Sequence, residues 1–482
     1  MHTYFFDVTD IMRYIKTETS VSGIQRVSLE IIKRMLQRYG AERVQLCYWD
    51  KRAQRYFAKD AGFLGDMETF DADVLSAVFF GSNARQAQTV VPMLARYRNQ
   101  PLKYHFHHSV AVLQALRGNA RHFQSRGSSI AEWHAAKAAV RASSVPSVSA
   151  AKPDDGKTDM GTVVAPSDQI IVLGASWGIA GLDECFQRLV DEKGVHVSLL
   201  IHDLIPVVTP EHIPGDLPLE FYRWLEHSAG YCRRYFANSL HTARDLKMFM
   251  DETGVQRPVE VIPLAQQAVQ PPSETQQDRS LKARARRIRD LDGATLALTK
   301  APYVLVVGTM ESRKNLWRLA QAWARLAQDR DLEAPKLVLA GKRSLQNEDF
   351  NTWMEKSGNL NGWVQFADRP SDGALAYLYE NCLFTATVSL YEGWGLPIGE
   401  SLAFGKTAVV ADNSSMPEVG GDMVEYCDAG SIDSIYRACR KLITDPDHRH
   451  QLETRIKTTR LRSWDDVVAD FIQQLDPDPE VS

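Results

Sequence analysis

Short apolar runs alternate with segments of helical periodicity along most of the 482 residues. This alternation is typical of parallel sheets that are covered by helices on both faces, so the pattern predicts an α/β protein. In the first half the predicted strands are TYFFDV (3–8), VQLCYW (44–49), QIIVLG (169–174), VSLLIHD (197–203) and RYFANS (234–239). In the second half they are YVLVVG (303–308), KLVLAG (336–341), VQFAD (364–368), CLFTATVS (382–389) and TAVVAD (407–412).

One polar interruption sets the expected domain boundaries. Apolar residues recur at helical spacing over 24–39 and 181–193, among other segments. The stretch 270–300 is polar and charged and breaks this periodicity, which is typical of a connection between domains. We expect a doubly wound domain over 1–270, a connection over 271–298, a second doubly wound domain over 299–462, and a C-terminal helix with a tail over 463–482.

The segment 85–164 departs from this pattern and is expected to be an insertion. Arg and Lys recur between 96 and 141, where Glu132 is the lone acidic residue. Apolar, aromatic and basic residues mix at helical spacing over 91–123, as in a helix that lies on an anionic bilayer. A basic surface hairpin that packs on its own domain explains the same pattern. The stretch 143–168 is rich in Ser, Pro, Ala and Gly and predicts a mobile loop.

Composition narrows the class of protein further. A chain of 482 residues is too long for one ordinary core. The formal net charge is −4, which gives no overall basic field for a nucleic-acid partner. No run reaches the roughly 18 apolar residues of a membrane span, and the first residues lack the pattern of a signal peptide. We expect a cytoplasmic protein that binds no nucleic acid. Peripheral contact of the insertion with the inner face of the membrane is one of the two alternatives given above for that segment.

The cysteines and potential metal ligands predict no metal site. The cysteines stand far apart, with no Cys-x-x-Cys pair and no histidine at zinc-ligand spacing, so we expect buried free thiols. The six are Cys47, Cys185, Cys232, Cys382, Cys427 and Cys439.

A glycine-rich loop with two glutamates follows one of the predicted strands. The stretch YEGWGLPIGESLAFG (391–405) places Glu392 in the loop and Glu400 within a short helix expected over 397–404. Ligands of open α/β sheets bind at the carboxyl ends of the strands, which is where Glu392 is expected. Carboxylates are strong acceptors for the vicinal hydroxyl groups of a sugar or a ribose.

The glycines of the same loop favour an anion. Gly393, Gly395 and Gly399 let backbone N–H groups approach a phosphate, and the helix N-terminus adds a favourable partial charge. A second turn supplies cations, because Arg313 and Lys314 follow the strand that ends at Gly308, just before a helix expected to begin near Asn315. Two adjacent cations can neutralise a diphosphate. By itself, Arg-Lys at a helix start is equally well explained as solvated surface.

Together these residues resemble the retaining glycosyltransferases of family four, which have the GT-B architecture of two Rossmann-like domains facing across a cleft. The motifs that carry the resemblance cover about 300–465 and are the E-x7-E pair Glu392 and Glu400, VGTMESRKN (307–315), LVLAGK (337–342) and NSSMPEVGGD (413–422). The resemblance implies that Glu392 contacts the transferred sugar, Glu400 the ribose, and Arg313 with Lys314 the diphosphate. It also implies further donor contacts, which are Gly308, Gly393, Gly395 and Leu396 at the phosphates and Asp368 near the base. It further implies that the first domain lies on the acceptor side and that the C-terminal helix crosses back to this domain.

The first half resembles the same family more weakly. TSVSGIQRVSLEII (19–32) is similar to the first strand-to-helix loop, with Gly23 allowing close approach of donor or acceptor and Gln25 and Arg26 opening the helix. LLIHDLIPVVTPEH (199–212) is similar to the segment that holds an active-site histidine, which here is His202, followed by Asp203. Taken alone, a histidine at a strand end is more often a hydrogen-bonded structural residue, and the resemblance to the family is what favours an active-site role for His202. The expected catalytic residues are thus His202, Arg313, Lys314 and Glu392.

The resemblance implies a retaining hexosyltransferase of polysaccharide biosynthesis that needs neither cofactor nor metal. The expected donor is a GDP- or UDP-linked hexose, with mannose as a candidate, and the expected acceptor is a glycan or a polyprenyl-linked glycan. Two alternatives are a sugar-nucleotide epimerase or hydrolase of the same fold, and a non-catalytic nucleotide-binding subunit. Hydrolysis normally needs two carboxyl groups about 5–10 Å apart across the scissile bond. Glu392 and Glu400 in one loop-helix unit do not suit that geometry.

Overall fold

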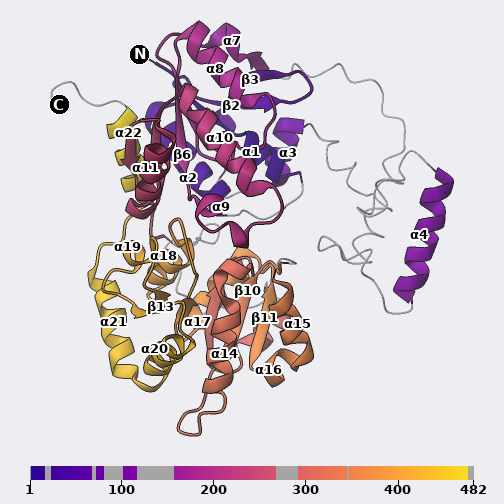
Figure 1. Cartoon of the computed structure of the whole chain (residues 1–482), viewed down its shortest axis with the longest axis vertical. Coiled ribbons are helices and arrows are strands. Elements are labelled where there is room, and N and C mark those ends of the chain that lie inside the picture. The colour runs from indigo at the N-terminus through magenta and orange to yellow at the C-terminus, as the bar shows by residue number, and fades with distance from the viewer. Residues whose placement is uncertain are drawn as a thin grey trace. The chain divides into compact units, whose positions relative to one another are not determined.

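The computed structural model describes residues 2–16, 23–67, 72–80, 101–116, 157–267, 291, 293–344 and 347–475. The chain divides into two compact units. One comprises Met1–Asp10, Ser20–Thr69 and Thr158–Ser482, and the other comprises Ile11–Thr19 and Phe70–Lys157. Two sheets organise the larger unit, and helices flank both of them (Figure 1). The predicted α/β class is confirmed.

The first sheet has eight strands in the order β4-β3-β2-β1-β5-β6-β7-β8. Its strands are β1 (Tyr4–Asp7), β2 (Val44–Asp50), β3 (Arg55–Asp60), β4 (Lys157–Asp159), β5 (Gln169–Val172), β6 (His196–Ile201), β7 (Cys232–Ala237) and β8 (Val259–Val261). Neighbouring strands in the row β2-β1-β5-β6-β7-β8 are all parallel to one another. We call this sheet with the helices packed on it the first lobe.

One strand of the first lobe contradicts the expectation of purely parallel sheets. β3 pairs with β2 in the antiparallel sense, with Trp49 opposite Tyr56. The connection is a tight turn in which the Asp50 carboxylate accepts the backbone N–H groups of Arg52 and Ala53. A parallel neighbour needs a long crossover, so a turn this short can only return the chain alongside in the opposite direction.

The second sheet has six strands in the order β11-β10-β9-β12-β13-β14. Its strands are β9 (Tyr303–Val307), β10 (Lys336–Gly341), β11 (Val364–Asp368), β12 (Thr385–Thr387), β13 (Ala408–Ala411) and β14 (Glu425–Cys427). Every pair in it is parallel. We call this sheet with its helices the second lobe. All ten strands expected from the apolar runs are present, whereas β3, β4, β8 and β14 were not expected.

Helices and short 3-10 turns connect the strands. They are α1 (Thr9–Tyr14), α2 (Gly23–Tyr39), α3 (Ala72–Phe80), α4 (Pro101–Leu116), α7 (Met160–Val163), α8 (Leu182–Lys193), α9 (Ile205–Val208), η4 (Pro210–His212), α10 (Leu217–Tyr231), α11 (Leu240–Thr253), α13 (Gly293–Leu298), η5 (Ser312–Lys314), α14 (Leu316–Leu326), α15 (Glu348–Lys356), α16 (Gly358–Gly362), α17 (Asp372–Asn381), α18 (Leu396–Ala403), α19 (Met416–Gly420), α20 (Ile432–Thr444), α21 (Pro446–Thr458) and α22 (Trp464–Leu475). In α2, for example, Val27, Ile31 and Met35 are buried and lie on one face, as the helical period requires.

The last helix packs on the first lobe although it follows the second sheet in sequence. Phe471 of α22 is buried against Phe236 of β7, with ring centroids 4.7 Å apart. Arg34 of α2 donates to Asp465 at 2.8 Å. Before the helix, the Arg462 side chain donates to the Pro263 carbonyl at 2.8 Å. In the part of the chain that the structure describes, residues near 263 and near 462 therefore lie side by side.

The predicted mobile loop over 143–168 is wrong for its second half. Residues 157–168 contain β4 and α7, and Met160 is fully buried in the core of the first lobe. The Asp159 side chain caps α7 by accepting the Gly161 N–H at 2.9 Å. Residues 143–156 and most of the predicted insertion lie outside the described residues. Within the smaller unit, α4 exposes a stripe of apolar side chains, namely Leu102, Phe106, Val110 and Leu113.

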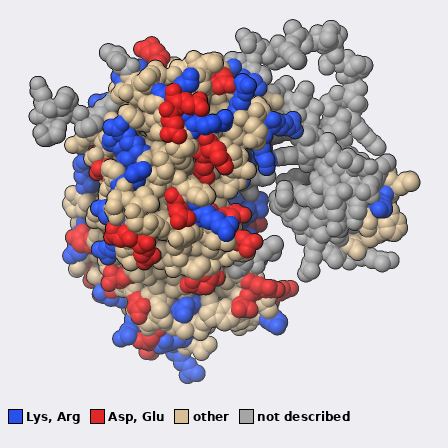
Figure 2. Space-filling model, turned by 45° about the horizontal axis from the view of Figure 1, so that its top comes forward, with Lys and Arg blue, Asp and Glu red and all other residues tan. Residues whose placement is uncertain are grey.

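The surface and the thiols agree with the composition. On the face drawn in Figure 2, acidic and basic side chains are interspersed over the larger unit, with no dominant field of one sign. All six cysteines lie in the described part of the chain and are buried and unpaired, as predicted. No described helix is both long enough and apolar enough to cross a bilayer.

Candidate functional site

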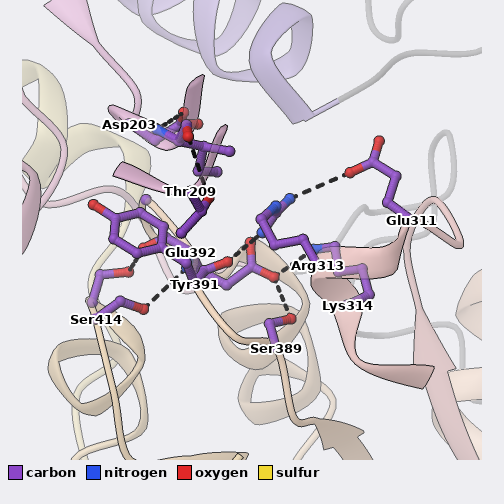
Figure 3. Close-up of polar contacts among 12 residues, drawn as sticks. Asp203, Thr209, Glu311, Arg313, Lys314, Ser389, Tyr391, Glu392 and Ser414 are labelled. Carbon is purple, nitrogen blue, oxygen red and sulfur yellow. Dashed lines mark hydrogen bonds and ion pairs between the residues drawn. The ribbon is translucent and has the colours of Figure 1, made fainter. Parts of the chain in front are cut away.

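The turn from β9 to α14 presents two cations at the carboxyl end of the second sheet. Gly308 has φ +135°, and the short helix η5 ends at Asn315 in the left-handed region with φ +59°. Asn tolerates this conformation, and its side-chain amide donates to the carbonyls of Val388 at 2.9 Å and Ala429 at 2.8 Å. These two bonds hold the turn, so Arg313 and Lys314 point across to the loop that follows β12 (Figure 3).

Glu392 lies between these cations. Its carboxylate is 2.5 Å from the Lys314 ammonium and 3.0 Å from the Arg313 guanidinium. The Ser389 hydroxyl donates a third contact at 2.6 Å. Burial alone would raise the pKa of Glu392, but Arg313 and Lys314 outweigh burial and lower this pKa to about 2. Glu392 is thus a carboxylate at any physiological pH.

Arg313 is itself held by several acceptors. Its guanidinium also donates to the Tyr391 backbone carbonyl and lies 3.5 Å from the Glu311 carboxylate. Its side chain is nine-tenths buried. An arginine in this position remains charged and keeps a fixed orientation, because its planar fork is bound on more than one side.

Two serines that the sequence analysis did not assign hold the backbone of Glu392. Its N–H donates to the Ser414 hydroxyl at 3.0 Å, and its carbonyl accepts from the Ser415 hydroxyl at 2.8 Å. Both serines belong to the NSSMPEVGGD stretch that follows β13. Their position after a strand, at the same sheet edge as Glu392, could have indicated from the sequence that these serines lie near the site. Which backbone group each serine contacts is decided only by the folded loop.

Gly393 is required for close contact between the lobes, and Gly23 also lies near the other lobe. A Cβ atom on Gly393 would lie 1.9 Å from the His202 carbonyl oxygen, a distance that no side chain tolerates. A Cβ atom on Gly23 would lie 3.0 Å from a methyl group of Leu396. Close approach of backbone to an anion was the expected reason for Gly393, whereas the structure shows close approach to the other lobe.

Gly395 serves the local turn instead. It has φ +96° and precedes α18, which begins at Leu396 with Pro397 in its first turn. This helix was expected over 397–404 and spans 396–403. Positive φ is accessible to glycine without a steric penalty, so the residue type follows from the backbone.

Glu400 faces a different set of partners from Glu392. It lies within α18 and is only 6% exposed. Arg26 of the first lobe donates to one carboxylate oxygen at 2.7 Å, and the Tyr379 hydroxyl donates to the other at 2.7 Å. Burial raises the pKa of Glu400, and Arg26 and Tyr379 oppose this effect. The two glutamates of the motif therefore have separate environments.

His202 and Asp203 stand at the end of β6, where the first lobe meets the Glu392 loop. The Nε2 atom of His202 lies 2.7 Å from the Leu173 carbonyl oxygen, which can only accept, so Nε2 carries the hydrogen. Burial lowers the pKa of His202, which favours the neutral ring with Nδ1 as an acceptor. Burial raises the pKa of Asp203, while Arg313 opposes the rise, and its carboxylate accepts the Ile205 N–H at 3.0 Å.

The remaining predicted residues lie around this centre. A small cavity among the described residues lies at the ends of β9, β10 and β12, and Gly308, Lys314 and Ser389 are part of its lining. Asp368 ends β11, at the edge of the sheet and two strands away from β9, and is exposed. The structure thus brings His202, Arg313, Lys314, Glu392 and Gly393 together, and it places Glu400 and Asp368 apart from them.

Comparison with known proteins identifies the second lobe. Residues 289–459 match the family described as Glycosyl transferases group 1. The chain is 31% identical over 171 residues to O-antigen chain mannosyltransferase B of Escherichia coli, which is 35% of this chain and 44% of that protein. It is 26% identical over 151 residues to the Escherichia coli serotype-specific mannosyltransferase WbdA, which is 31% of this chain and 18% of that protein. The chain thus spans less than half the length of these curated relatives.

Structural comparison covers the whole chain. The crystal structure of Anabaena Alr3699/HepE in complex with UDP and glucose superposes with a TM-score of 0.54 at 13% identity, over 98% of this chain and 99% of that one. This likeness shows the fold, and the predicted GT-B class with two Rossmann-like domains is confirmed. The predicted resemblance to group 1 glycosyltransferases is likewise confirmed for 289–459.

Proposed function

We propose that this chain is a retaining hexosyltransferase that moves a hexose from a nucleoside-diphosphate donor to a glycan or lipid-linked glycan in polysaccharide biosynthesis. One observation carries the proposal. In a second lobe that matches the group 1 glycosyl transferases, Glu392 is buried between Arg313 and Lys314 at the carboxyl ends of the strands. This arrangement supplies two fixed cations for a diphosphate and a permanent carboxylate for sugar hydroxyl groups.

The cations act on the leaving group. As the bond between the anomeric carbon and the phosphate oxygen breaks, its electron pair stays on that oxygen and negative charge develops there. Lys314 carries three N–H donors and Arg313 five, so each can bind phosphate oxygens while it remains paired with Glu392. Interactions that strengthen as this charge develops lower the barrier to reaction.

Glu392 serves as an acceptor and orients the hexose. Because its pKa is about 2, it holds no proton to donate to a leaving group. Neutral His202, with Nε2–H bound to Leu173, offers Nδ1 as a second acceptor for hydroxyl groups. The reaction then needs no protein acid. The acceptor oxygen attacks the anomeric carbon on the face that the diphosphate leaves, and its proton passes to the departing phosphate oxygen.

Glu400 is proposed to bind the nucleotide ribose and Asp368 to lie near the base. The names of the two Escherichia coli relatives support mannose as the hexose, and GDP-mannose is accordingly the first donor to test. For the acceptor side, the apolar stripe of α4 together with the basic residues of 85–164 supports peripheral contact with an anionic membrane. No metal and no cofactor are proposed for the reaction.

Transfer is tested directly with labelled GDP-mannose and UDP-glucose, each with and without a membrane fraction that carries lipid-linked glycan acceptors. The expected result is acceptor-dependent incorporation of hexose with the α or β configuration of the donor retained. Release of free hexose without acceptor would identify a hydrolase. Nucleotide binding without turnover under either condition would identify a non-catalytic subunit.

A further inference from the structure

The contact between Arg26 and Glu400 joins the two lobes. Arg26 lies in the first turn of α2, and Glu400 lies in α18. The Arg26 guanidinium approaches the Glu400 carboxylate to 2.7 Å. A Cβ atom on Gly23 would lie 3.0 Å from a methyl group of Leu396, so the starts of the same two helices lie close together near this ion pair. The function proposed for Glu400 in the second lobe thus involves a residue of the first.

The surroundings of Glu400 contain one cation and one further acid. Arg26 comes from α2, while Tyr379 and Asp372 come from α17, and the Arg26 guanidinium lies 3.9 Å from the Asp372 carboxylate. These are the charged and titratable groups that act on Glu400. Burial and Asp372 favour the protonated acid, whereas Arg26 and Tyr379 favour the carboxylate.

The protonation state matters because a ribose offers two vicinal hydroxyl donors. An ionised carboxylate has about four lone-pair sites on its two oxygens. Arg26 and Tyr379 each use one, on opposite oxygens, which leaves one site on each oxygen. A protonated Glu400 would lose part of this capacity and would turn one oxygen into a donor.

We propose that Arg26 is a positioning residue for the nucleotide, which acts across the lobes by holding Glu400 as an acceptor for both ribose hydroxyl groups. This inference rests on the proposed function, because it assumes that Glu400 binds ribose. It follows that full ribose recognition exists only when the lobes are together, since Arg26 reaches Glu400 from the first lobe. Donor binding and lobe closure therefore favour each other.

The test compares nucleotides with and without the two hydroxyl groups. Dissociation constants of GDP and 2′,3′-dideoxy-GDP are measured by calorimetry on the full chain, at about pH 8 and about pH 5.5. The corresponding UDP pair is used in parallel. For the unmodified protein we expect a preference for the ribose form of about tenfold, the equivalent of one hydrogen bond to a charged group.

Arg26→Gln is expected to lose this preference as the pH is lowered, because Glu400 then takes up a proton. At the lower pH, the ratio of the dissociation constant of 2′,3′-dideoxy-GDP to that of GDP should fall to near one in Arg26→Gln. The unmodified protein should keep most of its preference for GDP at the same pH. Arg26→Lys restores the charge and should retain the ratio at both pH values. Arg38→Gln removes the same charge from an exposed position of the same helix and should behave like the unmodified protein.

Two results would overturn the inference. Arg26→Gln with an unchanged ribose ratio at both pH values would show that Arg26 has no influence on ribose recognition. Tighter binding of GDP by Arg26→Gln would show that Arg26 competes with the ribose for Glu400. Failure of the unmodified protein to bind either nucleotide would count instead against the proposed function. Should Arg26→Gln not fold, Arg26→Met, which also removes the charge, is measured in its place and judged by the same criteria.

Discussion

At the scale of single residues, the site depends on charges that are buried in pairs. Glu392 is 7% exposed and Arg313 9%, so neither charge is solvated by much water. Glu392 lies within hydrogen-bonding distance of both Arg313 and Lys314, so opposite charges compensate one another in the buried group. Removing one member of such a group leaves the others uncompensated, which costs more than the net stabilisation that the intact group contributes.

The lowered pKa of Glu392 makes a prediction about stability. Its folded pKa of about 2 lies below the ordinary value of 4.5, so ionised Glu392 stabilises the fold above pH 4.5 and loses this effect as the pH falls toward 2. The difference of 2.5 units corresponds to about 3 kcal/mol at most. Urea unfolding of the unmodified protein and of Glu392→Gln should therefore give free energies of unfolding that differ less at about pH 3 than at about pH 6. A difference that is constant over this range would contradict the assignment.

Lys314→Ala tests the leaving-group role. We expect the transfer rate to fall by about 100-fold or more, as for the loss of one group that stabilises transition-state charge. Lys356→Ala serves as control, because Lys356 is an exposed residue in the last turn of α15 in the same lobe. Initial rates with saturating donor measure the effect. Equal rates for Lys314→Ala and the control would remove Lys314 from the mechanism.

At the scale of elements, the loop between β12 and α18 is shaped by what it packs against. Its Gly393 carbonyl accepts from the Thr242 hydroxyl at 3.3 Å, and the Tyr391 hydroxyl donates to Asp245, both in α11 of the first lobe. Glu418 of α19 accepts the backbone N–H groups of Leu240 and His241 at the start of α11, at 2.7 and 2.9 Å. A carboxylate at a helix N-terminus is favourable, so the second lobe completes a helix of the first.

Gly393→Ala is expected to disrupt this contact. The added methyl group would meet the rigid backbone carbonyl of His202 at 1.9 Å, so the loop must move and carry Glu392 with it. We expect a loss of stability of about 1–3 kcal/mol and a fall in transfer rate of about 100-fold. Thermal unfolding and initial rates measure both effects.

Gly373→Ala is the matched control for this change. Gly373 lies in the first turn of α17, and a Cβ atom there would have no neighbour within 4 Å. Alanine is the better helix former, so this variant should be as stable as the unmodified protein or slightly more stable. Similar losses of stability and transfer rate in both variants would show that the close approach of Gly393 to the His202 carbonyl is not the cause of the loss.

At the scale of the whole molecule, α22 ties the end of the chain to the first lobe. Phe471→Ala removes a fully buried ring from the contact with Phe236, and we expect a cost of about 3–5 kcal/mol. Amide hydrogen exchange should show lost protection in α2 and β7 before β9 and β10. Gln473→Ala changes an exposed position of the same helix and should leave the protection from amide hydrogen exchange unchanged. Loss of protection confined to the second lobe would contradict this account.

The apolar pattern was sufficient to predict the elements that carry the site. Each of the ten predicted strands has its counterpart, and α18 begins one residue before the predicted position. Strand and helix periods of two and 3.6 residues are properties of the local backbone, so they can be recognised in a sequence. The placement of Glu392 and the Arg313–Lys314 turn at one sheet edge followed from the same reasoning, because both come directly after parallel strands.

What the sequence by itself determined is the α/β class, the order of most strands and helices, and the residue types at the ends of the second sheet. Only the tertiary structure decided that Glu392 pairs with both cations, that Gly393 abuts His202, and that Arg26 reaches Glu400. The ion pairs among these contacts join residues that are 78 to 374 positions apart in the sequence. Such pairings depend on how whole lobes pack, and a local pattern carries no record of that packing.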